Sequence, residues 1–211
     1  MKPQNIEIHR RKKIKSIRLA IKGDLSLHIS VPMTYDQNQI KALLIKFAPW
    51  IEKSLKKILQ TQQKQEDILR AHPQQVPIFG DWREVSEYKS IELLRKILLE
   101  MLKERVGHWA AKMQVSPQKI SIRSNKKILG SCNYKNDLSF SILLVFAPIS
   151  LIDSVVIHEL AHILHKNHSK KFWDFVGQFC RDHRDARRIF KEQMGLYVLF
   201  YEHYYESQKS S

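Results

Sequence analysis

Hydrophobic and polar residues alternate along residues 14–31, which is typical of β-strands with one buried face. The apolar positions fall into two sets on either side of Gly23 and Asp24, so this stretch predicts a β-hairpin. From about residue 37 to residue 63 a helical period replaces the alternation and predicts an amphipathic helix. Pro49 lies inside that helix and is expected to kink or divide it, because proline lacks an N–H and crowds the preceding turn. The apolar positions are Ile17, Leu19, Ile21, Leu25, Leu27, Ile29 and Val31, then Ile40, Leu43, Leu44, Phe47, Ile51, Leu55 and Ile58.

A glutamine-rich stretch with two prolines, residues 61–77, follows the first helix and indicates a linker or a domain boundary. Residues 76–80 are expected to add a short strand. A second strong helical pattern extends from Ser90 to about Met113, and this helix is expected to pack against the helix that carries the metal motif described below. Three short apolar runs between residues 120 and 140 predict strands.

The clearest chemistry in the chain is an H-E-x-x-H motif formed by His158, Glu159 and His162. It lies in an apolar segment that is expected to be a buried helix, with Ser150 as N-cap and Asp153 at the spacing of a capping box. Residues four apart on a helix share one face, so the two histidines can hold one metal ion. Zn²⁺ is the expected ion, because it accepts imidazoles in a tetrahedral shell and leaves one position for water. Glu159 can then take a proton from the zinc-bound water.

A catalytic zinc site needs a third protein ligand. His168 follows the motif by six residues and can reach the ion only if the helix ends near His165. Asn167 tolerates the left-handed conformation that would turn the chain there, and Ser169 can cap the next helix. We therefore favour His168 as the third ligand and expect His165 to support the ligands or to line the pocket. Two carboxylates from later in the chain are the weaker candidates: Glu192 and Glu202.

Two more helices are predicted after the motif, from Lys170 to about Asp182 and from Arg184 to Met194, where Gly195 is expected to stop the second. The aromatic tail at residues 196–205 is expected to pack into the core. The chain is thus predicted to have three parts. They are a basic β-hairpin and helix module at residues 1–64, a linker with a short strand at residues 65–89, and a metallohydrolase domain at residues 90–211.

Positive charge is concentrated in the first of these parts. The chain has a formal net charge of +15 at pH 7. Residues 1–64 hold 14 Lys and Arg and 4 Asp and Glu, whereas residues 151–211 hold 9 and 8. This asymmetry suggests that the N-terminal module contacts nucleic acid or another polyanion. A solvated basic surface is the alternative, because no array of stacking aromatic residues accompanies the charges.

The cysteine content and the absence of long apolar runs bear on the compartment. Cys132 and Cys180 lie far apart and form no disulfide framework, which favours a reducing compartment. The longest apolar run, residues 142–147, is too short to cross a membrane. The first 25 residues are polybasic without the apolar core of a signal peptide. These features predict a cytoplasmic protein without a membrane partner, and they leave its oligomeric state open.

The residues around the metal motif resemble those of the YgjP-like metallopeptidases, which are relatives of the SprT-like zincins. The resemblance implies that zinc is bound by His158, His162 and His168 and that Glu159 is the catalytic acid and base. The chain departs from the family pattern at Ile128-Leu129, where the family usually has Arg-Trp, and in a shorter segment after Val85. The matching stretches are His158 to His162, Asn167-His168-Ser169, Phe172-Trp173, Gly130-Ser131-Cys132, Leu144 to Pro148 and Arg10 to Lys13 with the alternating strands that follow.

The motif and the resemblance together predict an α+β fold. Its catalytic domain would be a small zincin-type domain, in which the active-site helix packs on other helices and on a short antiparallel sheet. The expected function is that of a zinc-dependent metallopeptidase that acts on a peptide or protein. Zincins commonly bind an extended peptide along an edge strand, and the candidate strand here contains Gly130, Ser131 and Cys132. Ordinary packing within the sheet is the alternative role of this strand. The candidates for stabilising the oxyanion are Tyr134, His165 and His183.

Two other functions would keep the same metal motif. Zinc-dependent hydrolysis of a nucleotide phosphoanhydride would suit the positive charge, although no glycine loop that cradles phosphates is present. Alternatively, the chain is a nucleic-acid-associated protein whose zinc site is mainly structural. The SprT-like relatives suggest a combination of these activities, a protease that acts on proteins attached to DNA, and this suggestion rests on the resemblance alone.

Overall fold

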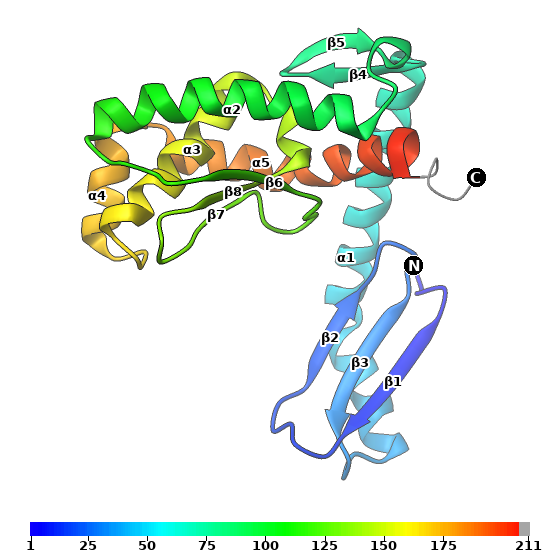
Figure 1. Ribbon diagram of the computed structural model, residues 1–211. Coiled ribbons are helices and arrows are strands. Elements are labelled where there is room, and N and C mark those ends of the chain that lie inside the picture. Colours follow the sequence, from blue (N-terminus) through cyan, green and yellow to red (C-terminus); the bar gives the residue numbers. More distant parts are fainter. Residues whose placement is uncertain (207–211) are drawn as a thin grey trace. The chain divides into compact units, whose positions relative to one another are not determined.

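The computed structural model describes residues 1–206 and divides into two compact units, residues 1–71 and the chain from His72 onward (Figure 1). Helices and small sheets occur together in the chain, which confirms the predicted α+β class. Within residues 1–206, no helix combines the length and the apolar character that a membrane span requires.

The first unit packs a three-stranded sheet on one long helix. β1 (Ile6–Arg11), β2 (Arg18–Ile21) and β3 (Leu27–Pro32) form the sheet in the order β1-β3-β2, and α1 extends over Gln37–Ala71. The predicted hairpin is formed by β2 and β3, which pair in antiparallel register. The sequence pattern did not indicate β1, which lies on the other side of β3 and pairs with it in parallel.

Alternation along β3 decides which face of this sheet is buried. Leu27, Ile29 and Val31 are fully buried in a core shared with α1, while the residues between them lie on the opposite face. α1 is a single helix that continues through Pro49, so the expected division is absent. Packing on both sides of the proline offsets the roughly 3 kcal/mol that proline costs inside a helix. The buried residues of α1 are Ile40, Leu43, Ile51 and Leu55.

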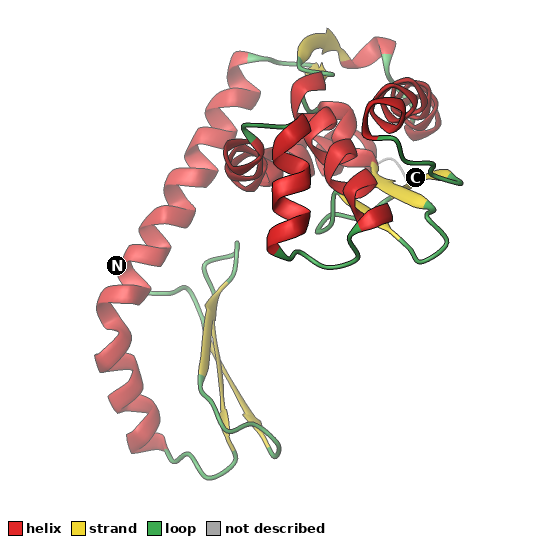
Figure 2. Cartoon of the chain, turned by 90° about the vertical axis from the view of Figure 1, so that its left-hand side faces the viewer, coloured by secondary structure: helices red, strands yellow, loops and turns green. Residues whose placement is uncertain are grey.

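Helices make up most of the second unit (Figure 2). Its hairpin strands β4 and β5 are joined by Phe79 and Gly80, which both have positive φ angles, 53° and 95°, as a type I′ turn requires. The last turns of α1 and this hairpin occupy most of residues 65–89, so the segment predicted as a linker is largely regular structure. In chain order the elements are β4 (Gln75–Ile78), β5 (Asp81–Glu84), η1 (Val85–Glu87), α2 (Ile91–Met113), β6 (Ile120–Arg123), β7 (Gly130–Cys132), β8 (Leu138–Ser141), η2 (Ile142–Phe146), α3 (Ile149–Leu164), α4 (Lys170–Phe179), α5 (His183–Tyr201) and η3 (Glu202–Glu206).

The sheet of the second unit has the order β6-β8-β7 and is mixed, whereas the sequence predicted an antiparallel sheet. β7 pairs antiparallel with β8, but β6 pairs parallel with β8. All four residues of β8 are buried, so this strand takes the centre of the sheet and separates the two strands that precede it in the chain. β7 is therefore an edge strand of this sheet.

α2 packs against α3, as the sequence predicted. A bidentate ion pair between Arg105 of α2 and Asp153 of α3 joins the two helices. Nε of Arg105 donates to Oδ1 of Asp153 at 2.6 Å, and Nη2 of Arg105 donates to Oδ2 at 2.5 Å. Both side chains are mostly buried, and the Asp153 carboxylate raises the pKa of Arg105. Such a planar, charge-assisted pair fixes orientation as well as distance. It thereby holds the N-terminal part of α3 on α2.

α5 continues to Tyr201, past the position at which Gly195 was expected to end it. The aromatic tail packs into the core, as predicted, with Tyr197, Phe200 and Tyr201 buried on α5. The ring of Phe200 lies 5.9 Å from that of Phe146, measured between centroids. Burial of these aromatic side chains outweighs the roughly 1 kcal/mol that glycine costs inside a helix.

Candidate metal centre

α3 places the two histidines of the H-E-x-x-H motif on one face. His158 and His162 lie one turn apart, with their ring centroids separated by 5.0 Å. α3 starts two residues earlier than expected, with Pro148 rather than Ser150 at the N-cap. Asp153 does not form a capping box, because its carboxylate is bound to α2 instead. The start of the helix was therefore misplaced, while the spacing of the motif on the helix is as predicted.

The end of α3 brings a third histidine back to the first two. His165 has the extended angles φ −124° and ψ 96° and ends the helix. Asn167 does not adopt the expected left-handed conformation; its side-chain oxygen accepts a hydrogen bond from the N–H of Ser169 at 3.3 Å. His168 then points back, with its Nε2 3.0 Å from Nε2 of His158 and its ring centroid 4.7 Å from that of His162. The turn thus comes from the extended His165 and from the Asn167 side chain.

Two of the three imidazoles are prepared to act as acceptors. Nδ1 of His162 lies 3.0 Å from the carbonyl oxygen of His165, so this nitrogen carries the proton and Nε2 keeps its lone pair. Burial lowers the pKa of His158 to about 3, with a further contribution from the neighbouring His162 and His168. His158 is therefore neutral at pH 7. Neutral imidazole is the form that binds metal ions.

Glu159 lies beside this cluster and is almost completely buried, with 5% of its surface exposed. Burial raises the pKa of its carboxyl group to about 8. Glu159, His158 and His168 line one cavity of about 620 Å³, together with Gly130 of β7. A buried carboxyl group, neutral imidazoles and an accessible cavity are the components of a metal-assisted hydrolytic site.

The family model for the YgjP-like metallopeptidase domain matches residues 15–90 and 83–193. The chain belongs to the YgjP-like metallopeptidase family. The two matched stretches overlap at residues 83–90. This overlap includes the segment after Val85 that is shorter than in the family pattern. Comparison with curated proteins and with solved structures gave no match.

The three histidines of this YgjP-like chain fit a metal ion. Their ligand atoms all lie within 4.8 Å of one another, and they belong to the imidazoles described above. For a tetrahedral zinc ion with bonds of about 2.0–2.1 Å to nitrogen, neighbouring ligand atoms are about 3.3 Å apart. The 3.0 Å between Nε2 of His158 and Nε2 of His168 is close to that value. Three nitrogen donors with one open position are typical of catalytic zinc sites.

Trp173, His183 and Arg187 of this YgjP-like chain line the cavity and stack on one another next to His168. The Trp173 indole stacks on His168 at 5.6 Å and on His183 at 5.3 Å, measured between ring centroids. The Arg187 guanidinium lies 4.8 Å from the centre of the same indole. The sequence pattern had not pointed to Arg187. A usable signal exists, because His183, Arg187 and Lys191 are spaced four residues apart on α5 and all three line the cavity.

Four residues considered from the sequence lie outside the cluster. The imidazole of His165 packs against Phe175, with centroids 5.6 Å apart. Glu192 is exposed on α5, and the carboxylate of Glu202 binds Nζ of Lys126 at 2.7 Å. Tyr134 is 91% exposed and does not line the cavity. Among the described residues, the candidate metal cluster of the second unit therefore consists of His158, His162 and His168.

For the metallopeptidase activity that the family membership indicates, we expect Gly130→Ala to lower kcat by roughly 10- to 100-fold, because it would displace Glu159, the expected catalytic acid and base, and small displacements of such a group have effects of this size. A Cβ atom at Gly130 would lie 2.6 Å from Cγ and 2.7 Å from Oε1 of Glu159, so the carboxylate must move. The matched control is Gly107→Ala on α2, where the added Cβ meets nothing within 4 Å. Steady-state kinetics on a cleaved peptide, with zinc content measured in parallel, test this expectation. Equal kcat values for the two variants would contradict it.

Proposed function

We propose that the chain is a zinc-dependent peptidase in which Glu159 is the general base and His158, His162 and His168 bind the metal. The observation that carries this proposal is the placement of a buried carboxyl group beside three converging imidazoles in one cavity. Core histidines would not need to converge on one point. The family membership supports a metal-dependent peptidase in general, and the donor set favours zinc in particular.

A zinc ion held by His158, His162 and His168 would supply a Lewis acid that lowers the pKa of its bound water to about 7 and can polarise a carbonyl group. Glu159 accepts the proton of the attacking water and later gives a proton to the leaving amine. The burial that raises the pKa of Glu159 suits the second step, in which the carboxyl group holds a proton, and a zinc cation beside it would favour the ionised form that the first step needs. The carbonyl of His165 fixes the tautomer of His162 and so keeps its Nε2 available for the ion.

β7 is the proposed binding strand for an extended peptide. The carbonyl of Leu129 accepts from the N–H of Ser141 at 2.8 Å, and the N–H of Asn133 donates to the carbonyl of Asp137 at 3.1 Å. In an antiparallel pair the hydrogen-bonded positions alternate. The main-chain groups of Gly130 therefore point away from β8, toward the free edge, where a substrate backbone can pair with them.

Arg187 and His183 are proposed to face the negative oxygen that develops on the substrate. Both line the cavity, and both are held by the indole of Trp173. Nδ1 of His183 lies 3.1 Å from the carbonyl oxygen of Cys180 and donates to it, so Nε2 can donate to a negative oxygen only in the doubly protonated imidazolium, whereas the Arg187 guanidinium donates in its ordinary charged form. Donors that are fixed in place before the reaction stabilise developing charge most effectively.

The second candidate function is hydrolysis of a nucleotide phosphoanhydride. It is favoured by three cationic side chains that line the same cavity, Lys127, Arg187 and Lys191. The peptidase proposal ranks first because β7 offers main-chain groups for a peptide, whereas no glycine loop for phosphates follows from the sequence.

Incubation of the purified chain with a peptide library and, separately, with nucleoside triphosphates distinguishes the two functions. Mass spectrometry should show peptide cleavage, and phosphate release from nucleotides should stay at background. A chelator should abolish cleavage, and added Zn²⁺ should restore it. The zinc-deficient control is His162→Ala. Phosphate release without peptide cleavage would reverse the ranking, and cleavage that survives chelation would contradict the zinc mechanism.

A further inference from the structure

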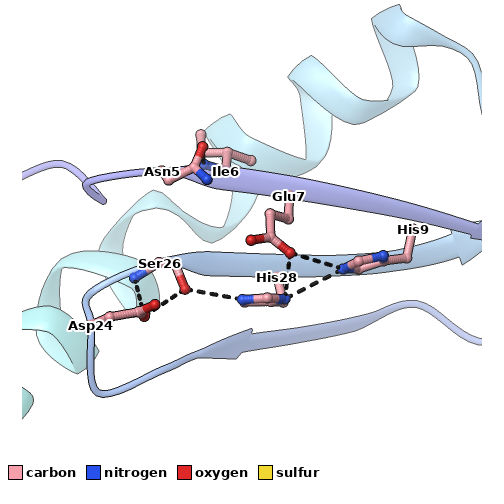
Figure 3. A network of polar contacts seen from close by, with 7 residues as sticks. All are labelled: Asn5, Ile6, Glu7, His9, Asp24, Ser26 and His28. Carbon is pink, nitrogen blue, oxygen red and sulfur yellow. Dashed lines mark hydrogen bonds and ion pairs between the residues drawn. The ribbon is translucent and has the colours of Figure 1, made fainter.

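We propose that the N-terminal unit carries a second metal site, formed by Glu7, His9 and His28 on the face of the sheet opposite α1. The ligand atoms of these three side chains lie within 4.8 Å of one another. Figure 3 shows the two imidazoles and the carboxylate directed toward a common point between β1 and β3. This site is separate from the peptidase centre, which lies entirely in the second unit.

Strand pairing explains why these residues meet. β1 and β3 run parallel with Glu7 opposite His28, and alternation places His9 on the same face of β1. The other face of β3 carries the buried Leu27 and Ile29. A register shift of one residue would bury the polar cluster and expose the core, so the core fixes the cluster in place.

The distances fit a tetrahedral ion. Oε2 of Glu7 lies 3.2 Å from Nδ1 of His28 and 3.4 Å from Nε2 of His9, and the two nitrogen atoms are 3.3 Å apart. The three atoms thus form a nearly equilateral triangle. Its edges match the roughly 3.3 Å between neighbouring ligands of tetrahedral zinc. They exceed the roughly 2.7–2.9 Å expected for charge-assisted hydrogen bonds between imidazolium and carboxylate.

The protonation of His28 also suits a metal ligand. The Ser26 hydroxyl donates to Oδ1 of Asp24 at 2.6 Å, and this hydrogen bond holds the pKa of Asp24 below its ordinary value. Because that hydroxyl has one proton, Nε2 of His28, 3.0 Å from the Ser26 oxygen, must donate to it (Figure 3). In the neutral imidazole, which is the form that binds metal ions, Nδ1 of His28 then carries the lone pair and faces Glu7 and His9. A carboxylate that orients a histidine in this way is typical of metal sites.

The donor set indicates which ion is bound. Two imidazole nitrogens and one carboxylate oxygen suit Zn²⁺, while Ca²⁺ and Mg²⁺ prefer oxygen donors alone. Glu7 and His9 are roughly 40% exposed, so a zinc ion can enter from solvent and water can take its fourth position. The bound ion would join β1 to β3. In a unit of 71 residues with a small core, such a link adds stability.

Zinc binding to the full-length His158→Ala/His162→Ala variant isolates the second site. Titration calorimetry should show about one remaining zinc ion per chain, retained during gel filtration. Adding His9→Ala or Glu7→Gln should abolish that binding, and Ser26→Ala should weaken it by about 10-fold. His108→Ala, an exposed histidine outside both clusters, is the matched control and should change nothing.

Far-UV circular dichroism establishes that each variant is folded, and Glu7→Gln gives a second ligand change of conserved size. No zinc binding by the folded double variant would overturn the second site, as would binding that persists in both His9→Ala and Glu7→Gln. The peptidase proposal is tested independently, because the His9→Ala chain with an intact first site should still cleave peptides.

Discussion

Glu159→Gln should lower kcat by on the order of 10²-fold or more while the chain keeps its full zinc content. Glutamine has nearly the same size as glutamate but cannot accept the proton of the attacking water. The change also places no charge in the cavity, and Glu159 is almost completely buried, so the packing around β7 should be preserved. Steady-state kinetics on a cleaved peptide, combined with metal analysis of the same sample, measure both quantities.

The matched control is Glu192→Gln, the same substitution at an exposed position of α5 outside the cavity lining. Its kcat should equal that of the wild type within about twofold, because surface changes usually have small effects. Undiminished activity in Glu159→Gln would remove Glu159 as the base. Loss of zinc together with activity would instead assign it a structural contribution to the metal site.

The metal motif could be found in the sequence because its geometry is local. Four residues of helix fix the relation between His158 and His162, whatever the rest of the fold does. The return of His168 could be anticipated for a similar reason, since only the end of α3 decides it. The predicted cause of the turn, a left-handed backbone conformation at Asn167, was wrong, however. Asn167 acts through its side-chain oxygen, which accepts from the N–H of Ser169, and the chain leaves the helix through the extended backbone of His165.

The N-terminal sheet shows what local patterns cannot supply. The alternation of residues 14–31 predicted the hairpin of β2 and β3, but β1 pairs with β3 from a distant part of the sequence. Ile6 and Ile8 of β1 are each 41% exposed, so the strand has a weak apolar signal. The proximity of Glu7 and His28 follows from this pairing alone. For that reason the second cluster is visible only in the folded chain.

The second unit shows how tertiary packing overrides local rules. Gly195 carries a helix-stop signal, yet α5 continues because Tyr197 and Phe200 gain burial against the core. The residues of α5 that line the cavity, Arg187 among them, all precede Gly195. A helix that ended at Gly195 would still contain Arg187. However, the number of residues between Arg187 and the metal motif does not fix the distance between them in the folded chain.

His168→Ala should cost far more zinc affinity than His165→Ala, and this comparison tests the end of α3. Removing one ligand of a zinc site should weaken binding by on the order of 10²-fold or more, given that total binding energies are about 10–16 kcal/mol. His165 contributes its main-chain carbonyl to His162, and alanine retains that carbonyl. Its imidazole packs only on Phe175 among the ring contacts of the described residues, so His165→Ala should change the affinity by less than about 10-fold.

Competition with a chromogenic chelator measures both affinities. The two variants are best compared in the His9→Ala chain, in which the proposed second site cannot contribute, and thermal unfolding of each variant shows that the second unit remains folded. Equal losses would mean that the His165 side chain also acts on the metal. The reverse order would place the ion one turn further along α3, next to His165, and would remove His168 from the ligand set.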